Sequence, residues 1–145
     1  MSFAALDTSQ LSLDNSTTRA AARAVASQWI TAFNTGDVER LVELYDPEAV
    51  KFPAGSNTPI MGVGALRRYF AGLEWNGATA ELGDEIETRA ITDRSAVTSG
   101  YYHFNMPLGE EQTRLSVRYS FVLVRHIRNW RIAHDHASVV LPTAN

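Results

Sequence analysis

Apolar residues in the first half of the chain recur at helical spacing. Between positions 18 and 35 they fall three or four residues apart, which gives a helix one apolar face. That face comprises Ala22, Val25, Ala26, Trp29, Ile30 and Phe33. Gly36 suits the left-handed end of this helix, and Asp37 can cap a second helix that ends at Asp46-Pro47. The second helix would present Val38, Leu41, Val42 and Tyr45 on its apolar side. A third helix is predicted over 63–73.

The pattern changes after Asn76-Gly77, where alternation of apolar and polar residues replaces the helical period. Strands are predicted over 79–91, 95–106, 113–126 and 129–140, and a short strand is predicted over 50–52. Helices followed by a run of strands are typical of an α+β fold. We therefore expect a curved, cone-shaped antiparallel sheet with three N-terminal helices packed on its concave face.

Residues 1–17 are rich in Ser, Thr, Asp and Asn without a clear period, and they are predicted to be a flexible N-terminal arm. Residues 18–142 are predicted to form a single domain, because the chain has the length of one domain and no linker interrupts it.

Composition excludes several classes of function. The net charge of −3 and the lack of a basic run argue against a nucleic-acid partner. No apolar run approaches the length of a membrane span, so no membrane partner is expected. The absence of cysteine excludes disulfides and thiolate catalysis. Because residues 1–6 do not resemble a secretory signal, a cytoplasmic location is expected.

The last predicted strand carries the main chemical signal. Trp130, Ile132, His134, His136 and Ser138 are two residues apart, so a regular strand points them all the same way. The series begins apolar and ends with two imidazoles and a hydroxyl, which is typical of a pocket wall. We therefore expect these side chains to line the cone.

Two histidines and an arginine are the candidate catalytic residues. His134 and His136 can exchange protons near neutral pH. Arg118, on the preceding strand, is expected to face the same cone and to stabilise a carboxylate or enolate. Two other interpretations stay open, namely ligand binding without chemistry and histidines that only tie the sheet to the helices. Metal binding by these histidines with His103 is not expected, because His103 alternates with the apolar Tyr102 and Phe104.

A second group of residues is predicted to contact the ligand. It combines aromatic side chains suited to a flat apolar molecule with two polar side chains, and we expect Tyr45, Phe52, Asn57, Tyr102, Phe104, Trp130 and Ser138 to bind it. Asn57 would lie at the mouth of the cone, while Ser138 and Tyr102 would orient the ligand.

Three motifs in order resemble a known superfamily. The first is residues 33–50, with its Phe-x-x-Gly-Asp and Leu-x-x-Leu-Tyr runs. The second combines residues 100–104 and 118–121, and the third is Trp130-x-x-x-His134-x-His136-x-Ser138. The first is similar to the opening of the nuclear transport factor 2-like superfamily, which includes SnoaL-like polyketide cyclases and ketosteroid isomerase. The others resemble more closely bacterial proteins like the association domain of calcium/calmodulin-dependent protein kinase II.

The resemblance implies a cone-shaped pocket for a small apolar or anionic molecule and a homodimer formed through the outer face of the sheet. It implies a cofactor-free isomerase, cyclase or lyase acting on an apolar carbonyl or carboxylate compound in small-molecule or polyketide metabolism. The alternative is a non-catalytic ligand-binding or oligomeric assembly module. Ketosteroid isomerase has an Asp before proline as its base, whereas this chain has Phe52-Pro53, and Trp29 replaces the isomerase's tyrosine. That mechanism is therefore not expected here.

Overall fold

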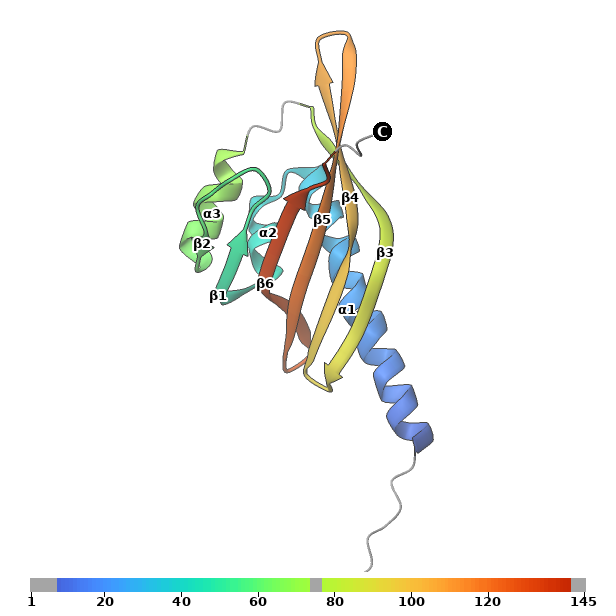
Figure 1. Ribbon diagram of the computed structural model, residues 1–145. Coiled ribbons are helices and arrows are strands. Elements are labelled where there is room, and N and C mark those ends of the chain that lie inside the picture. Colours follow the sequence, from blue (N-terminus) through green and yellow to red (C-terminus); the bar gives the residue numbers. More distant parts are fainter. Residues whose placement is uncertain (1–7, 74–76, 142–145) are drawn as a thin grey trace, which may run out of the picture.

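A long, curled sheet covered on one face by helices forms the frame of the protein (Figure 1). The computed structural model describes residues 8–73 and 77–141. The helices are α1 (Thr8–Thr35), α2 (Val38–Glu43) and α3 (Val63–Gly72). The strands are β1 (Tyr45–Phe52), β2 (Ile60–Met61), β3 (Thr79–Thr92), β4 (Ser95–Leu108), β5 (Glu111–His126) and β6 (Asn129–Val139). The predicted α+β class with three N-terminal helices is confirmed.

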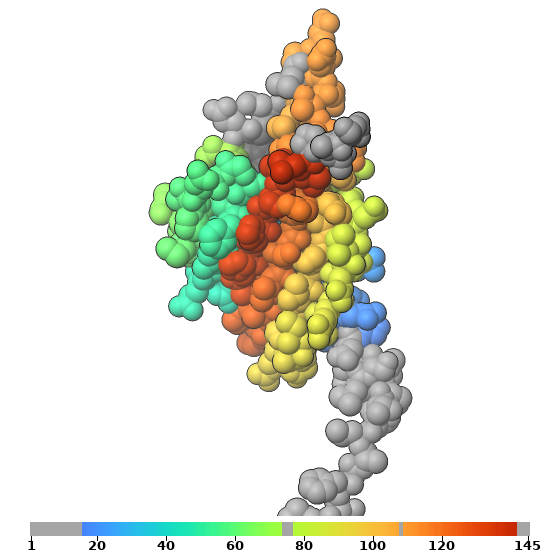
Figure 2. Space-filling view, viewed as in Figure 1, coloured from blue at the N-terminus to red at the C-terminus, as the bar shows by residue number. Residues whose placement is uncertain are grey.

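The sheet is mixed rather than purely antiparallel. Its strand order is β2-β1-β6-β5-β4-β3, and the last four strands of the chain form antiparallel hairpins. However, β1 lies parallel to β6. The Ile132 N–H donates to the Leu44 carbonyl at 2.7 Å, which fixes the start of this parallel pair. The sheet is therefore open at β2 and β3, and Figure 2 shows its outer face, where the strands lie side by side without a helix over them.

Two helix boundaries differ from the predictions. Helix α1 already begins at Thr8, so part of the segment predicted to be a flexible arm is helical, and residues 1–7 lie outside the described residues. Helix α2 ends at Glu43, and Tyr45 is the first residue of β1 rather than part of a helix. Pro47 sits where the β1–β6 register shifts, which is where a strand tolerates a residue without an N–H. No helix in 8–73 or 77–141 is long and apolar enough to span a membrane.

The core lies between the helices and the concave face of the sheet. Trp29 of α1 stacks on Phe33 and on Tyr102 of β4, with ring centroids 5.5 and 5.3 Å apart. Asn34 fastens the end of α1 to β3, because its amide donates to the Ala80 carbonyl at 2.8 Å and accepts from the Ala80 N–H at 2.6 Å. This packing places the aromatic side of α1 directly over the sheet.

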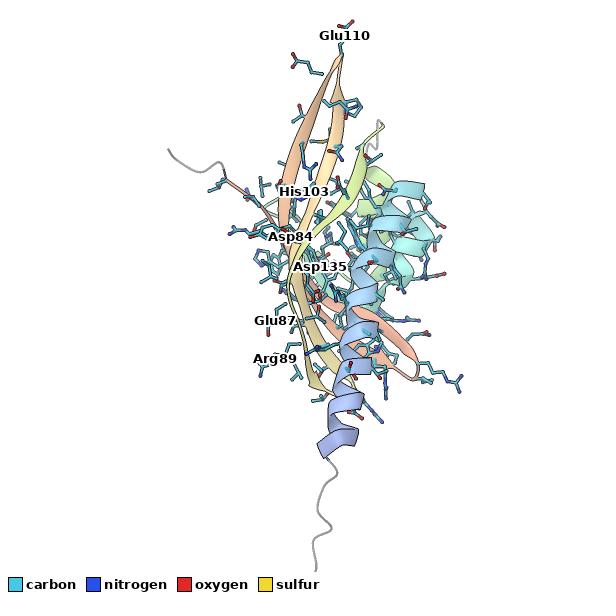
Figure 3. All side chains as sticks on the ribbon, turned by 90° about the vertical axis from the view of Figure 1, so that its right-hand side faces the viewer. Asp84, Glu87, Arg89, His103, Glu110 and Asp135 are labelled. Atoms are coloured by element: carbon cyan, nitrogen blue, oxygen red, sulfur yellow. The ribbon has the colours of Figure 1, made fainter. Side chains whose placement is uncertain are left out.

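A bulge in β6 reverses the predicted faces of that strand. Leu123 of β5 pairs with Ile132, but its neighbour Val122 pairs with His134, so one extra residue of β6 is left unpaired. An extra residue exchanges the two faces of every position that follows. Accordingly Ile132, Asp135 and Ala137 are buried on the concave side, and Figure 3 shows Asp135 on the helix-covered side of the sheet.

The prediction that the polar end of this series lines the cone is therefore wrong in its geometry. His134 is half-buried, His136 is exposed and Ser138 is half-buried, all on the outer face. Arg118 is also exposed there, where its Nε donates to Ser138 Oγ at 3.3 Å. The simple alternation of a strand could not foresee this, because a bulge has no clear signature in the sequence around Ala133.

Gly100 provides a test of the close approach between β3 and β4. A Cβ atom at this position would lie 2.8 Å from the Asp84 carbonyl oxygen and 3.0 Å from the Tyr119 hydroxyl. Because the strand backbone cannot move far, Gly100→Ala should lower the free energy of unfolding by about 1–3 kcal/mol in urea denaturation. Gly72→Ala, where a Cβ meets nothing within 4 Å, is the control and should not destabilise the protein. Equal stability of the two variants would contradict the close approach.

Candidate functional site

An aromatic pocket opens between α1, α3 and the concave face of the sheet. Its volume is about 240 Å³. It is lined by Trp29, Phe33, Lys51, Ala54, Tyr69, Phe70, Leu73, Ala78, Tyr102, Phe104, Met106 and Leu115. Among these described lining residues, Lys51 carries the single charge. The pocket is therefore an apolar cavity with one cationic group, a combination that can orient a small molecule.

The parallel pairing of β1 with β6 positions that cation. Lys51 lies beside Asp135 in the register, and both side chains point to the concave side. Their Nζ and Oδ2 atoms are 2.7 Å apart, and the side chains are 3% and 1% exposed. A charge this deeply buried needs a partner. The two strands therefore bring an ion pair to the base of an aromatic pocket.

Asp135 is also the end of a buried hydrogen-bond chain. Trp29 Nε1 donates to the Tyr45 hydroxyl at 2.9 Å, and that hydroxyl donates to Asp135 Oδ2 at 2.7 Å. The second carboxylate oxygen, Oδ1, is buried and has no hydrogen-bond partner among the described residues. Oδ2 thus receives both Lys51 and Tyr45, while Oδ1 retains an unused acceptor.

The Lys51 ammonium lies near two aromatic rings. Its Nζ is 5.8 Å from the Trp29 ring centroid and 6.0 Å from that of Phe70, distances at which ring faces attract a cation. An ammonium has three N–H donors, and Asp135 is its single acceptor within 8–73 and 77–141. Donors are therefore left over for an oxygen of a molecule in the pocket.

Burial keeps the tyrosines of this region protonated. Burial, reinforced by the Asp135 charge, raises the pKa of Tyr45 and of Tyr102 well above 10. The same causes raise the pKa of Tyr69. The Tyr45 hydroxyl is already engaged as a donor to Asp135. Tyr69 and Tyr102 line the pocket as neutral phenols that can donate to a ligand.

The comparisons with known proteins agree with this architecture. A family model described as a SnoaL-like domain matches residues 22–142. The chain belongs to the SnoaL-like family. No curated protein matches the chain.

Solved structures share the fold of this SnoaL-like domain. A nuclear transport factor 2-like protein with a cystatin-like fold from Novosphingobium aromaticivorans is 15% identical, with a TM-score of 0.79 over 94% of this chain and 90% of that one. A Xanthomonas campestris protein provisionally described as a calcium/calmodulin-dependent protein kinase II association domain is 24% identical, with a TM-score of 0.75 over 84% and 87%. A ketosteroid isomerase-like protein from Erwinia carotovora atroseptica is 16% identical, with a TM-score of 0.72 over 85% and 96%.

The SnoaL-like domain places the predicted site residues in four locations, three of them away from the outer face of the sheet. Tyr102 and Phe104 line the aromatic pocket, and Tyr45 lies in the hydrogen-bond chain beside it. Asn57 is exposed in the loop after β1. Trp130 lines a different cavity, beside α1 and α2.

The remaining predicted residues meet on the outer face of the sheet. The Phe52 ring, 39% exposed, lies 5.5 Å from the rings of both His134 and His136. Arg118 and Ser138 contact each other on the same face. The structure thus places these five on one face, in two contacting groups, on the side of the sheet opposite the pocket. No group of three His, Asp or Glu side chains arranged to hold a metal is found in the part of the chain that the structure describes.

Sequence reasoning missed Lys51 and Asp135. Lys51 is the only lysine of the chain, an available signal because every other basic side chain is arginine or histidine. An unbroken alternation of β6 places Asp135 on the solvent side, and the bulge moves it to the interior.

Replacing the buried cation tests the ion pair. Lys51→Met leaves the Asp135 carboxylate buried without its charge partner, so the free energy of unfolding should fall by about 3–5 kcal/mol in urea denaturation. The double variant Lys51→Met/Asp135→Asn should recover most of that loss, because the amide oxygen of the introduced asparagine can still accept from Tyr45. Arg67→Met, which removes the exposed pair with Glu39, is the control and should change little. A fully stable Lys51→Met variant would show that the buried pair is not required.

The raised tyrosine pKa values predict a loss of stability at high pH. Above pH 10, the unfolded chain releases phenolic protons that folded Tyr45 and Tyr102 retain, so the unfolded state binds fewer protons and stability decreases. Below pH 10 these groups should not make the free energy of unfolding depend on pH, and above pH 10 the free energy of unfolding should fall steadily. Tyr45→Phe should make the decline shallower, as measured by denaturation at several alkaline pH values. An unchanged slope in Tyr45→Phe would contradict the assignment to Tyr45.

Proposed function

We propose that this SnoaL-like domain binds a small, largely apolar molecule bearing a carbonyl or carboxylate oxygen in the aromatic pocket. The observation that carries the proposal is the buried Lys51 ammonium, in a lining whose other described residues are uncharged and largely aromatic. The rings of the pocket would hold the apolar body of the molecule, and Lys51 would contact its oxygen.

The electrostatics favour an oxygen with negative charge. Lys51 already pairs with Asp135, but the other N–H donors of its ammonium have no acceptor among the described residues and can reach a ligand oxygen. Charge-assisted hydrogen bonds are stronger than neutral ones. The phenols of Tyr69 and Tyr102 add neutral donors on the pocket wall. A carboxylate, or a carbonyl that acquires enolate character, suits this set of donors.

A cofactor-free isomerase, cyclase or lyase step is the catalytic form of this proposal. Lys51 would stabilise the enolate oxygen with a charge-assisted hydrogen bond, while Asp135 would hold the ammonium in position from below. The likeness to a ketosteroid isomerase-like protein is consistent with such chemistry but concerns the fold.

Binding of a matched pair of ligands tests the proposal. Cinnamate and cinnamamide share a flat apolar body and differ in charge, so cinnamate should bind more tightly by about tenfold, or roughly 1.4 kcal/mol, in calorimetry. Ala54→Leu fills part of the pocket and should weaken both ligands. Thr58→Leu, in the same loop but exposed, is the matched control and should leave both affinities unchanged. Equal affinity for the two ligands, or indifference to Ala54→Leu, would contradict the proposal.

An assembly module is the second candidate, and the outer face of the sheet supports it. Phe52 of β1 and His136 of β6 are exposed on this face. No helix covers it (Figure 2). A second copy of the chain could cover this face as a homodimer, with Phe52 at its centre. Mass in solution, compared between the natural chain and Phe52→Glu, separates this candidate from simple ligand binding by a monomer.

A further inference from the structure

Lys51 carries a reactivity that its ion pair does not use, because a lysine that has lost its proton is a nucleophile. It is the only lysine of the chain, its side chain is 3% exposed, and it lies in the lining of the aromatic pocket. A molecule held in that cavity by its apolar body brings its carbonyl group to the same place as the amine. Lys51 therefore combines a reactive group with a binding site.

A proton acceptor lies directly against the ammonium. Asp135 Oδ2 is 2.7 Å from Lys51 Nζ, and both side chains are almost fully buried. Transfer of one proton along this hydrogen bond converts two buried charges into a neutral amine and a neutral carboxylic acid, and charges in an apolar interior are costly to keep. A small population of neutral amine is enough, because a covalent reaction draws on it continuously. The proton does not have to leave for water.

Two phenols supply proton donors for a carbonyl oxygen. Burial, and to a lesser extent the Asp135 charge, raises the pKa of Tyr69 and of Tyr102, so both stay protonated in the pocket lining. Neither hydroxyl forms a hydrogen bond with another described residue. The Tyr102 ring stacks on Trp29 at 5.3 Å, and Lys51 Nζ is 5.8 Å from the centroid of the same indole. An amine and a free phenol thus lie close to one ring.

We propose that Lys51 forms an imine with a flat aldehyde or ketone held in the aromatic pocket. The inference rests on the proposed function, because the same cavity must take up the apolar body of the molecule. It narrows the substrate class from any carbonyl or carboxylate compound to one with a reactive carbonyl carbon. A carboxylate would occupy the pocket only as an ion partner of the lysine.

The reaction balances without an oxidant or a cofactor. Lys51 passes one proton to Asp135, and the nitrogen lone pair forms a bond to the carbonyl carbon while the π electrons move to the oxygen. Tyr102 donates a hydrogen bond to that oxygen, and a proton of the new C–N nitrogen moves to it and gives a carbinolamine. The proton on Asp135 then leaves with the hydroxyl group as water. The product is a protonated imine paired with the Asp135 carboxylate.

Reductive trapping tests the imine. The full chain is incubated with benzaldehyde and cyanoborohydride, which reduces an imine to a stable secondary amine, and the adduct is located by peptide mass spectrometry. Because the chain has one lysine, a benzyl group on Lys51 is told apart from one on the terminal amine by its peptide. Labelling of Lys51 should saturate with benzaldehyde and fall by about tenfold or more when excess cinnamate occupies the pocket. Ala54→Leu should also reduce labelling, whereas Thr58→Leu, exposed in the same loop, should not.

A second measurement does not require the reductant to enter the pocket. Benzaldehyde isotopically labelled at its carbonyl carbon should give an imine resonance by NMR with the natural chain and none with Lys51→Arg, which keeps the charge but is not a nucleophile. The peptide map keeps the test valid even if Lys51→Arg does not fold. Tyr102→Phe should still bind benzaldehyde but form the imine about a hundredfold more slowly.

The outcomes separate the imine from the proposed function. Absence of both the Lys51 adduct and the imine resonance, while calorimetry shows that cinnamate binds, would overturn the imine and leave the proposed function standing. Labelling of Lys51 that neither cinnamate nor Ala54→Leu reduces would overturn the pocket as the place of reaction. Failure of cinnamate and benzaldehyde alike to bind would overturn the proposed function and the imine with it.

Discussion

The buried ion pair between Lys51 and Asp135 is the interaction on which the interior of this protein depends. It joins the first strand of the chain to the last across the parallel pairing of β1 and β6. It also receives the hydrogen-bond chain that descends from Trp29 through Tyr45. Because neither charge is exposed, each needs the other as its partner. Strands β1 and β6 and helix α1 must therefore adopt the arrangement that brings Lys51, Asp135 and Tyr45 together. The aromatic pocket is built around that arrangement.

The elements themselves followed from the sequence, because helical and alternating periods are strong signals over long segments. The third helix and the four long strands lie close to their predicted positions. The bounds of the short elements could not be predicted in the same way. Tyr45 continues an apolar helical face in the sequence, yet it is the first residue of a strand in the structure. The parallel partner of β1 could not be foreseen either, because register between distant strands leaves no local pattern.

The site was harder to predict than the fold for one physical reason. Strand alternation has a period of two, so a single extra residue transfers every later side chain to the other face. The bulge in β6 does this between Ile132 and His134 and exchanges two imidazoles for one carboxylate in the interior. Tyr102 and Phe104 were placed correctly because no bulge interrupts the pairing of β4 with β5. Trp130 precedes the bulge and lies on the helix side of the sheet, but in a cavity beside α1 and α2 rather than in the aromatic pocket.

The pairing of β1 with β6 has a further consequence, for the order in which the chain folds. Lys51 and Asp135 are 84 residues apart in sequence, and Tyr45 and Asp135 are 90 apart. Contacts of such long range carry a large loop-closure cost and form late compared with hairpins such as β4–β5. Until β6 docks, Lys51 stays hydrated and the pocket has no floor. On the ribosome, therefore, the interior is completed only after the last strand has emerged.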